Sequence, residues 1–574
     1  MTALCWNRGS LRFHFCKALL FGVACATATW IGYLVKYMVW CFLCLDFAFF
    51  QIIRYHCVHW DANERKNVDD NILTDIPWII TTEGKKTIEE TLLLSHVEGF
   101  NISKEQEGFF YGAQIRILTQ IAILAIRNTA GGIDHVLDNG FSQESLTETF
   151  EQLDDGAHLR SGKYPYMQWP LDTDVTGKTQ QNVEKLLSTG ASSDFWDLGS
   201  RKTALSLEDA TLWATVWGLY SMAGNTVIQG KRHKNCAPAG RGDYAGRTAT
   251  EIIFEGETLS ETLINCADTK ALLSKNTDDL PAWADREGTR SNTLTEMGPL
   301  WKLSWSSNAC LLHWENDEVV KASLGGVPNN WLPTGFKESG YNDALKNWDA
   351  DRDVEDAFYM YAHEEKNGET KPRLKEIPYE ISTTEMMLRW VLEGAYAFKK
   401  PRPGVRTKNP VILQHKLSDD FKTPLIRSSR VLDTDPSLWI LAGNTDPDVV
   451  RNVKMLAEYV NDVRGCLEKA MQKRKDPESQ KGYVFDEDFT PIRRDVLETF
   501  WNNLEQTYRK AALSFEEGEE FDQRIQRDIK TITVETFRDV TQPLQFTNPR
   551  KVFQATKRLQ TLLHRLDEKE NSNE

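Results

Sequence analysis

The last quarter of the chain carries hydrophobic residues at the spacing of helices. Beyond residue 444, apolar residues recur every three or four positions in four successive stretches. The four stripes are Val450, Val453, Leu456, Val460, Val463, Leu467 and Met471; Ile492, Val496, Phe500, Leu504 and Tyr508; Ile525, Ile529, Ile532 and Phe537; and Val552, Ala555, Leu559, Leu562 and Leu566. Because no amphipathic helix buries its stripe alone, we predict a four-helix bundle over residues 441–574. Pro447, Pro491 and Pro549 stand where three helices are expected to begin.

Residues 68–440 carry mixed patterns instead. Residues 109–127 are almost continuously apolar and predict a buried core helix, and residues 207–223 predict a second helix with Ser206 as its N-cap. Residues 298–305 and 309–314 are interpreted as paired strands with aromatic side chains on the buried face. The predicted fold class is therefore α+β, with a mixed α/β N-terminal domain followed by the bundle.

The first 67 residues differ from the rest of the chain. Residues 18–35 are continuously apolar, and residues 37–53 are apolar apart from Asp46, which is long enough for a membrane hairpin or one span. A carboxylate at the centre of a span costs about 2.5–3.5 kcal/mol. Because ordinary polar sequence begins near Val68, we interpret residues 1–67 as translation from upstream of the true start, with a membrane anchor as the second interpretation.

The composition indicates the cellular compartment of the protein more clearly than its function. The formal net charge of −15 argues against indiscriminate coating of nucleic acid, although a local basic patch is sufficient for a specific contact. Six of the ten cysteines fall within the first 57 residues. The others show no disulfide or zinc spacing, so they predict small buried residues in a reducing cytoplasm, with no metal and no cofactor. Most of the 18 tryptophans are interpreted as core residues.

No motif for catalysis is found in the sequence. Nucleophile elbows, zinc-protease helices, phosphate-binding loops and dinucleotide fingerprints are all lacking. His313 and His363 have no partner visible in the sequence and are interpreted as packing or surface residues. We therefore expect that the protein is not an enzyme. A carbohydrate hydrolase, which the acidic and Trp-rich composition suggests, is one alternative, and a membrane-anchored protein is another.

A loop rich in glycine and arginine spans residues 239–248 and precedes an apolar run and a helical stretch at residues 256–265. Glycine allows the backbone to approach a ligand closely, and Arg241 and Arg247 carry charge suited to phosphate. Taken alone, such a loop is more often an ordinary surface turn with solvated arginines. Nucleic-acid binding and a simple turn both stay open on this evidence.

Six short stretches of sequence, which we call blocks, follow one another along the chain in a recognisable order. They are Asn71-Ile-Leu-Thr-Asp-Ile-Pro-Trp78-Ile, Tyr111-Gly-Ala-Gln-Ile-Arg-Ile-Leu, Lys163-Tyr-Pro-Tyr-Met-Gln, Leu205-Ser-Leu-Glu-Asp-Ala-Thr-Leu, Gly256-Glu-Thr-Leu-Ser-Glu-Thr-Leu-Ile-Asn and Gly298-Pro-Leu-Trp-Lys-Leu-Ser-Trp. Their order and spacing, followed by a helical bundle, resemble the CasA family, the large subunit of the type I-E CRISPR surveillance complex Cascade. The resemblance covers most of residues 70–570.

The resemblance implies a DNA-recognition subunit that reads the protospacer-adjacent motif in the duplex while guide RNA pairing reads the target. Its glycine loop, which enters the minor groove, corresponds to residues 235–247 here. Asn235, Ala237 and Pro238 stand near positions where glycine is expected, so the preferred motif is expected to differ. The DNA-contacting residues implied by the resemblance are Gly240, Arg241, Gly242, Gly246 and Arg247 in the loop, Lys337 as a lysine finger, Phe421 as an apolar wedge and Lys422 as a phosphate contact.

The resemblance also implies a contact with the guide RNA and with other proteins. Phe195, Trp196, Asp197 and Arg201 are placed at the guide's 5′ handle, although a core role for the two aromatic residues is nearly as well supported. Arg550, Lys551, Lys557 and Arg558 are phosphate neighbours in the bundle or else a solvated helix face. The implied partners are guide RNA, double-stranded target DNA, the backbone and small subunits of Cascade, and the effector helicase-nuclease.

Overall fold

The computed structural model describes residues 70–160, 164–171, 180–183, 204–220, 226–228, 231–233, 250–285, 296–306, 308–326, 356–359, 361–366, 369–374, 377, 379–392, 396–397, 401–417, 426–442, 444–474 and 483–571. All of them belong to one compact unit that spans residues 70–574. The expected extension over residues 1–67 lies outside the described residues. The division at residues 440 and 441 stays a prediction.

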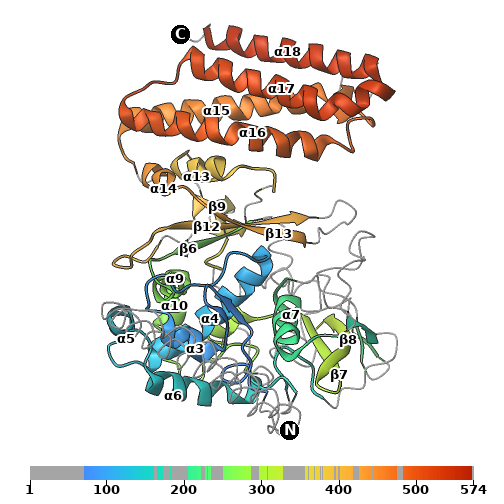
Figure 1. The fold of residues 1–574 in the computed structure, drawn as a ribbon. Coiled ribbons are helices and arrows are strands. Elements are labelled where there is room, and N and C mark those ends of the chain that lie inside the picture. Colours follow the sequence, from blue (N-terminus) through green and yellow to red (C-terminus); the bar gives the residue numbers. More distant parts are fainter. Residues whose placement is uncertain are drawn as a thin grey trace, which may run out of the picture. The chain divides into compact units, whose positions relative to one another are not determined.

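A long buried helix, α4 (Gly108–Asn128), forms the centre of the first hydrophobic core (Figure 1). It is long and apolar enough to cross a membrane, but 94% of its most apolar window is buried inside the protein. The prediction of a core helix over residues 109–127 is thus confirmed. The elements around it are β1 (Ile79–Thr81), β2 (Gly84–Lys86), α3 (Ile88–Leu94), α5 (Gly132–Asn139), α6 (Gln143–Leu153), α7 (Leu207–Tyr220), α9 (Leu259–Cys266) and α10 (Thr269–Leu272).

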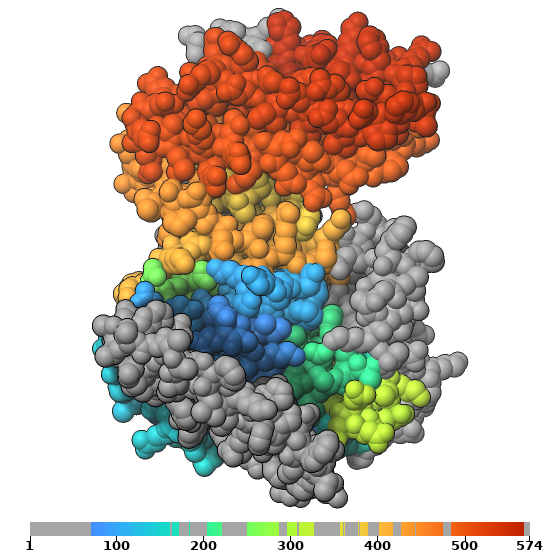
Figure 2. All heavy atoms as spheres, in the orientation of Figure 1, coloured from blue at the N-terminus to red at the C-terminus, as the bar shows by residue number. Residues whose placement is uncertain are grey.

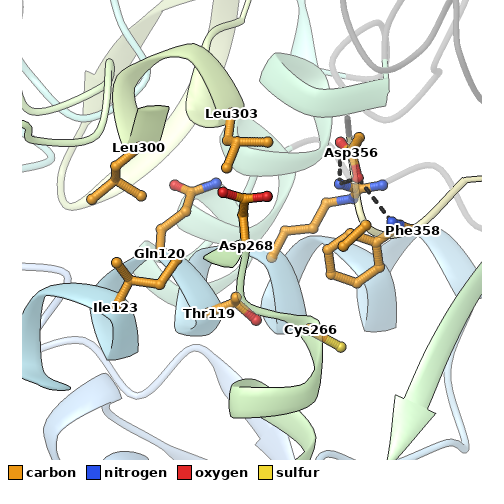
Figure 3. Close-up of a pocket in the computed structure, with 11 residues that line it drawn as sticks. Thr119, Gln120, Ile123, Cys266, Asp268, Leu300, Leu303, Asp356 and Phe358 are labelled. Atoms are coloured by element: carbon orange, nitrogen blue, oxygen red, sulfur yellow. Dashed lines mark hydrogen bonds and ion pairs between the residues drawn. The ribbon is translucent and has the colours of Figure 1, made fainter. Parts of the chain in front are cut away.

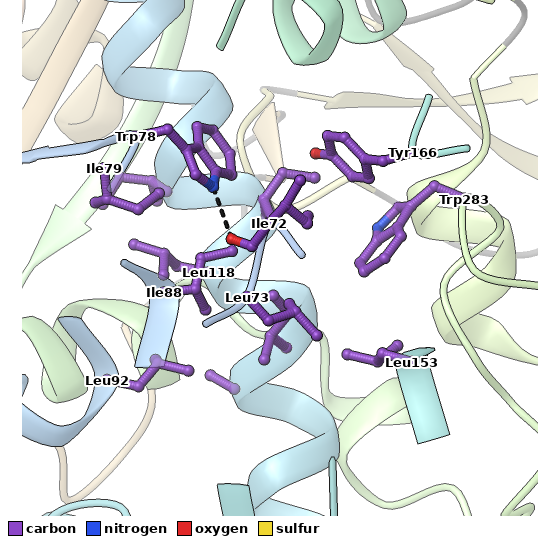
Figure 4. Packing of buried hydrophobic residues seen from close by; sticks show 14 of the residues in the cluster. Ile72, Leu73, Trp78, Ile79, Ile88, Leu92, Leu118, Leu153, Tyr166 and Trp283 are labelled. Carbon is purple, nitrogen blue, oxygen red and sulfur yellow. Dashed lines mark hydrogen bonds between the residues drawn. The ribbon is translucent and has the colours of Figure 1, made fainter. Parts of the chain in front are cut away.

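Aromatic residues fill the first core in the way that the tryptophan content predicts. Trp78 is buried and donates a hydrogen bond from Nε1 to the carbonyl oxygen of Ile72 at 3.0 Å, and Trp283 meets the ring of Tyr166 edge to face at 5.3 Å (Figure 4). A buried indole N–H group usually has a hydrogen-bond acceptor, as Trp78 has here. Cys266, Cys310 and Cys466 are buried and form no disulfide among the described residues, as expected of isolated cysteines.

An antiparallel sheet in the order β13-β12-β6 lies beside α4, with β6 at Thr250–Glu255, β12 at Asn409–Leu417 and β13 at Ile426–Asp433. Its side chains alternate between two cores, as the period of a strand requires. Ile253, Val411 and Leu413 join the core around α4, whereas Ile252 and Ile412 join a second core. The sheet therefore contributes apolar side chains to a core on each of its faces.

Three small sheets and three short helices complete the described residues of the mixed part. Strand β7 (Asn308–Glu315) pairs with β8 (Glu318–Gly326), which also pairs with β3 (Gln180–Asn182), and β9 (Tyr361–Lys366) lies between β10 (Glu369–Leu374) and β11 (Tyr396–Ala397). The remaining elements are β4 (Thr226–Ile228), β5 (Lys231–His233), α11 (Pro299–Ser304), α13 (Thr383–Leu392) and α14 (Pro436–Ala442).

The predicted strand over residues 298–305 is wrong, because Pro299–Ser304 forms helix α11. Proline occupies the first turn of this helix, where its missing N–H costs nothing. The Asp279 carboxylate then accepts hydrogen bonds from the backbone N–H groups of Leu300 and Trp301 at 3.1 and 3.2 Å. The cap comes from about 20 residues upstream, so the local pattern of aromatic residues did not reveal it.

The four predicted C-terminal helices are present as α15 (Pro447–Ala470), α16 (Arg493–Ser514), α17 (Gln523–Thr547) and α18 (Pro549–Asn571), with β14 (Gln472–Arg474) and β15 (Tyr483–Phe485) between the first two. Their apolar stripes meet in the second core. Figure 2 shows the atoms of these helices, in orange and red, as one closely packed block. Pro447 and Pro549 begin helices as predicted. Pro491 does not, because it lies in the turn before α16.

Polar contacts join the bundle to α13. The Tyr508 hydroxyl of α16 donates to the Glu385 carboxylate at 2.6 Å, and the Thr384 hydroxyl donates to Glu505 at 2.6 Å. Met387 and Leu388 of α13 belong to the same hydrophobic core as the bundle helices. The second core therefore runs from the sheet through α13 into the bundle.

Candidate nucleic-acid interface

Each residue that the sequence predicts to contact nucleic acid in the mixed domain lies outside the described residues. This holds for Gly240, Arg241, Gly242, Gly246, Arg247, Lys337, Phe421, Lys422, Phe195, Trp196, Asp197 and Arg201. Their roles stay predictions. The described residues that flank three of these segments can be examined directly, as can the basic residues of the bundle.

Residues next to the three expected DNA-contacting segments meet around one buried arginine. Arg116 of α4 places its Nη1 3.0 and 2.8 Å from the two carboxylate oxygens of Asp356, and its Nε donates to Glu251 Oε1 at 3.1 Å. Nη2 forms a further ion pair with Glu251. The side chains of Arg116 and Glu251 are 2% and 0% exposed. One guanidinium thus binds two carboxylates from distant parts of the chain.

Glu251 is the junction of this network. Its Oε2 accepts a hydrogen bond from the Tyr220 hydroxyl at 2.8 Å and lies 3.0 Å from His415 Nε2. The other ring nitrogen of His415 lies 2.8 Å from the Ser429 hydroxyl, which joins β12 to β13. We call Arg116, Tyr220, Glu251, Asp356 and His415 the Arg116 cluster.

Electrostatics keeps the central carboxylate of the cluster ionised. Burial alone raises the pKa of Glu251, but the charge of Arg116 and the hydrogen bond from His415 outweigh burial and hold this pKa well below its usual range. Burial raises the pKa of Tyr220, and the Glu251 charge raises it further. Tyr220 is therefore a neutral hydrogen-bond donor to an ionised acceptor.

Two glycines allow α4 to approach the other elements closely. Gly108, Gly112 and Arg116 are spaced four residues apart and share one helix face. A Cβ at Gly108 would overlap the Ser429 hydroxyl, and one at Gly112 would overlap the Tyr220 hydroxyl and come within 2.8 Å of Leu413 Cδ1. The face of α4 that carries Arg116 therefore packs closely against β13 at Gly108 and against α7 and β12 at Gly112.

A small cavity adjoins the cluster between α4 and α11. Its volume is about 30 Å³, and its lining includes Arg116, Gln120, Asp268 and Asp356 (Figure 3). That volume holds about one water molecule. It does not accommodate a nucleotide or a sugar. No group of histidine, cysteine and acidic side chains suited to a metal ion is present in the described part of the chain.

Sequence reasoning missed the Arg116 cluster. The available signal was Arg116 itself, the single charged residue between positions 109 and 126 of a strongly apolar helix. A buried charge needs partners, so this arginine was a signal, which the sequence analysis did not use, that an acidic residue lies beside the helix. Its partners are 135 and 240 positions away in the chain, and no periodicity identifies them.

A basic groove lies between the end of α15 and α18. Its volume is about 700 Å³, and the residues that line it are Lys469, Gln472, Phe553, Gln554, Lys557, Arg558, Thr561, Leu562 and Arg565. All its charged side chains are cationic, and the Phe553 ring is 70% exposed. Exposed cations around an aromatic face suit phosphates and bases.

Lys551 of α18 differs in its contacts from the basic residues of this helix that line the groove. Lys551 forms ion pairs with Asp486 at 3.0 Å and with Asp488, so it fastens α18 to the chain before α16. Arg558 lines the groove while its Nη1 donates to the carbonyl oxygen of Gln472 at 2.5 Å. Lys557 and Arg565 are exposed and have no ion-pair partner among the described residues. The sequence interpretation omitted Lys469 and Arg565, because only the fold brings α15 beside α18.

Comparison with protein families gives one match. A family model described as CRISPR-associated protein Cse1 matches residues 73–382, which is more than half of the 574 residues of the chain. The chain belongs to the Cse1 family. This confirms the resemblance to the CasA family, since CasA and Cse1 name the same protein in one of the matching structures. The match includes the positions of the glycine loop and Lys337 and ends before Phe421 and Lys422.

Solved Cse1 structures share the fold. Cse1 from Acidimicrobium ferrooxidans is 16% identical, with a TM-score of 0.54 over 86% of this chain and 98% of that chain. CasA (Cse1) from Thermus thermophilus is 15% identical, with a TM-score of 0.55 over 86% and 98%. A chain of a CRISPR RNA-guided surveillance complex is 16% identical, with a TM-score of 0.56 over 86% and 99%. No curated protein matches. The predicted α+β fold with a C-terminal helical region is confirmed.

Proposed function

We propose that this chain is the large subunit of a type I-E CRISPR RNA-guided surveillance complex in the cytoplasm. In this role it recognises the protospacer-adjacent motif in duplex DNA, helps to start strand opening and R-loop formation, and recruits the effector helicase-nuclease. The observation that carries the proposal is the Cse1 family match over residues 73–382. A structural match that covers 99% of one chain of a surveillance complex supports it.

The proposed division of labour assigns a short reading task to this protein. Guide RNA pairing identifies the target, and the protein needs to inspect only a few base pairs of duplex beside it. Minor-groove readout is degenerate and sensitive to groove shape, which suits a backbone loop with glycines at Gly240, Gly242 and Gly246. Lys337 and Phe421 then support and open the duplex. None of these tasks requires catalysis, so cleavage belongs to the recruited nuclease.

The bundle is proposed to hold a nucleic acid strand and to meet the small subunit of the complex. The groove along α18 supports the first part, because it combines Lys469, Lys557, Arg558 and Arg565 with the exposed ring of Phe553. These groups recognise phosphates and base faces without reading sequence. That property suits a strand whose sequence is checked elsewhere.

The test is binding of the assembled complex to a duplex library in which the flanking positions are randomised. The wild-type complex is expected to select a short motif, and Arg241→Ala together with Arg247→Ala is expected to flatten that selection. Each lost contact to a base or phosphate corresponds to about 1–3 kcal/mol, or roughly a five- to 150-fold change. A single-stranded target complementary to the guide serves as the control, because it needs neither motif recognition nor strand opening. Equal binding of all flanks by the wild-type complex would contradict the proposal.

A further inference from the structure

The Arg116 cluster takes one residue from each of several chain segments that border the expected DNA contacts. Tyr220 is the last residue of α7 and precedes residues 221–249, which contain the glycine loop, while Glu251 follows the same segment. Asp356 directly follows residues 327–355, which contain Lys337. His415 lies near the end of β12, shortly before residues 418–425, which contain Phe421 and Lys422.

Hydrogen bonds and ion pairs connect these borders to one another through two side chains. Arg116 contacts Asp356 and Glu251, and Glu251 contacts Tyr220 and His415. Ser429 extends the network to the strand that follows the third segment. Arg116 also lies over the ring of Phe358 at 4.0 Å, which fixes the backbone beyond Asp356. A shift of the guanidinium would therefore displace residues at the borders of all three segments.

Stability alone does not explain such an arrangement. Replacing a buried ion pair by apolar residues of similar volume is often neutral or stabilising, because burial removes both charges from water. What the bidentate guanidinium adds is fixed geometry, since its planar donors accept the carboxylates in only a few orientations. The cluster thus specifies where the three borders lie relative to one another.

We infer that Arg116 is a positioning residue for recognition of the flanking motif, acting through Glu251 to hold the borders of the three DNA-contacting segments in one arrangement. This role rests on the proposed function. Arg116 itself is buried and contacts no DNA. Its loss is expected to lower motif selection more than it lowers binding to a target that needs no motif.

The test uses two variants in the assembled complex. Arg116→Lys keeps the charge but removes the bidentate contacts, and Tyr220→Phe removes one hydroxyl while keeping the ring. Arg127→Lys is the matched control for the first, because Arg127 lies on the same helix and pairs with Asp279 at 2.8 Å. Tyr166→Phe is the matched control for the second, because its buried hydroxyl lies 3.0 Å from the Thr215 hydroxyl, outside the cluster.

The readout is the ratio of the Kd for a duplex with a mismatched flank to the Kd for a duplex with the preferred flank. We expect each cluster variant to lower this ratio by about tenfold, the effect of about 1.4 kcal/mol, with unchanged Kd for the single-stranded target. The two controls should keep the wild-type ratio. Combining Tyr220→Phe with Arg247→Ala should lower the ratio by less than the product of the single effects, because both changes act on one segment.

Other outcomes separate the inference from the proposed function. A wild-type complex without motif selection contradicts the proposed function before any substitution is made. If the wild type selects a motif and Tyr220→Phe selects it equally well, the positioning role is overturned alone. It is also overturned if the cluster variants weaken binding to duplex and single-stranded targets by the same factor, because that pattern describes a general structural defect.

Discussion

Replacing Lys557 and Arg565 with alanine removes two exposed cations from the groove on α18 and breaks no ion pair with another described residue. If each of them binds one phosphate, each releases about 0.7 counterions from a single strand or about 0.9 from duplex DNA. The double variant should therefore reduce the slope of log Kobs against log salt by about 1.4–1.8. Between 50 and 200 mM salt, this corresponds to about a tenfold smaller loss of affinity.

The measurement is the Kd of the assembled complex for a target duplex at several salt concentrations. A matched control is Arg451→Ala with Lys454→Ala on α15, which changes the net charge equally. Arg451 pairs with Asp448 at 3.1 Å and Lys454 lies 3.9 Å from Glu458, so both cations already have acidic neighbours. The control should keep the wild-type slope. Equal slopes in the two double variants would refute phosphate binding by the groove. Any change from the wild-type slope would then reflect the change in net charge alone.

Further predictions concern the stability of the free chain. Gly112→Ala should lower the free energy of unfolding by about 1–3 kcal/mol, because the added Cβ meets the Tyr220 hydroxyl. Gly465→Ala, whose added Cβ would have no atom within 4 Å, should raise the free energy of unfolding by about 0.5–1 kcal/mol. Urea titration measures both values, and the opposite order would contradict the close fit of α4. Tyr508→Phe should lower the free energy of unfolding by about 1.5–3 kcal/mol, since it removes the hydroxyl that donates to Glu385 Oε2, and an unchanged urea midpoint would count against that bond. Burial raises the pKa of Asp486, but the hydrogen bond from Lys551 outweighs burial and lowers this pKa. The pair therefore stabilises the folded chain fully above the usual pKa of aspartate, and this stabilisation is lost as the pH falls through the lowered pKa of Asp486. The Tm difference between wild type and Lys551→Met should therefore be present at pH 7 and shrink in acid, and a constant difference would argue against this pair.

The sequence predicted those elements whose signal is local. The four C-terminal helices and α4 carry apolar residues at helical spacing over several turns, and such a pattern persists whatever packs against it. Asp446 and Asp522 cap α15 and α17 through their own side chains. Helix α11 was misread because it is short and its cap, Asp279, comes from another part of the chain.

The candidate sites depend on pairs that sequence spacing does not reveal. Arg116 and Asp356 are 240 positions apart, and their meeting follows from the packing of α4 against the rest of the core. The groove on α18 likewise requires Lys469 of α15 beside Arg565, although the two helices are separated by two others in the chain. A charged residue in an apolar helix signals that a partner exists without indicating which residue it is.

The blocks that carried the resemblance have structural positions in the fold. Trp78 lies in the first core, Gly256–Asn265 leads into the capped and buried helix α9, and the block beginning at Gly298 forms α11. Such positions need only keep their volume, polarity and caps for the fold to persist, which is compatible with 16% identity at a TM-score of 0.54. The proposed reading of the motif would instead depend on side chains outside these blocks, where the fold tolerates many substitutions. A substitution in a block should therefore change stability, whereas exchanging residues 235–247 for those of another Cse1 protein should change the selected motif and leave stability nearly unaltered.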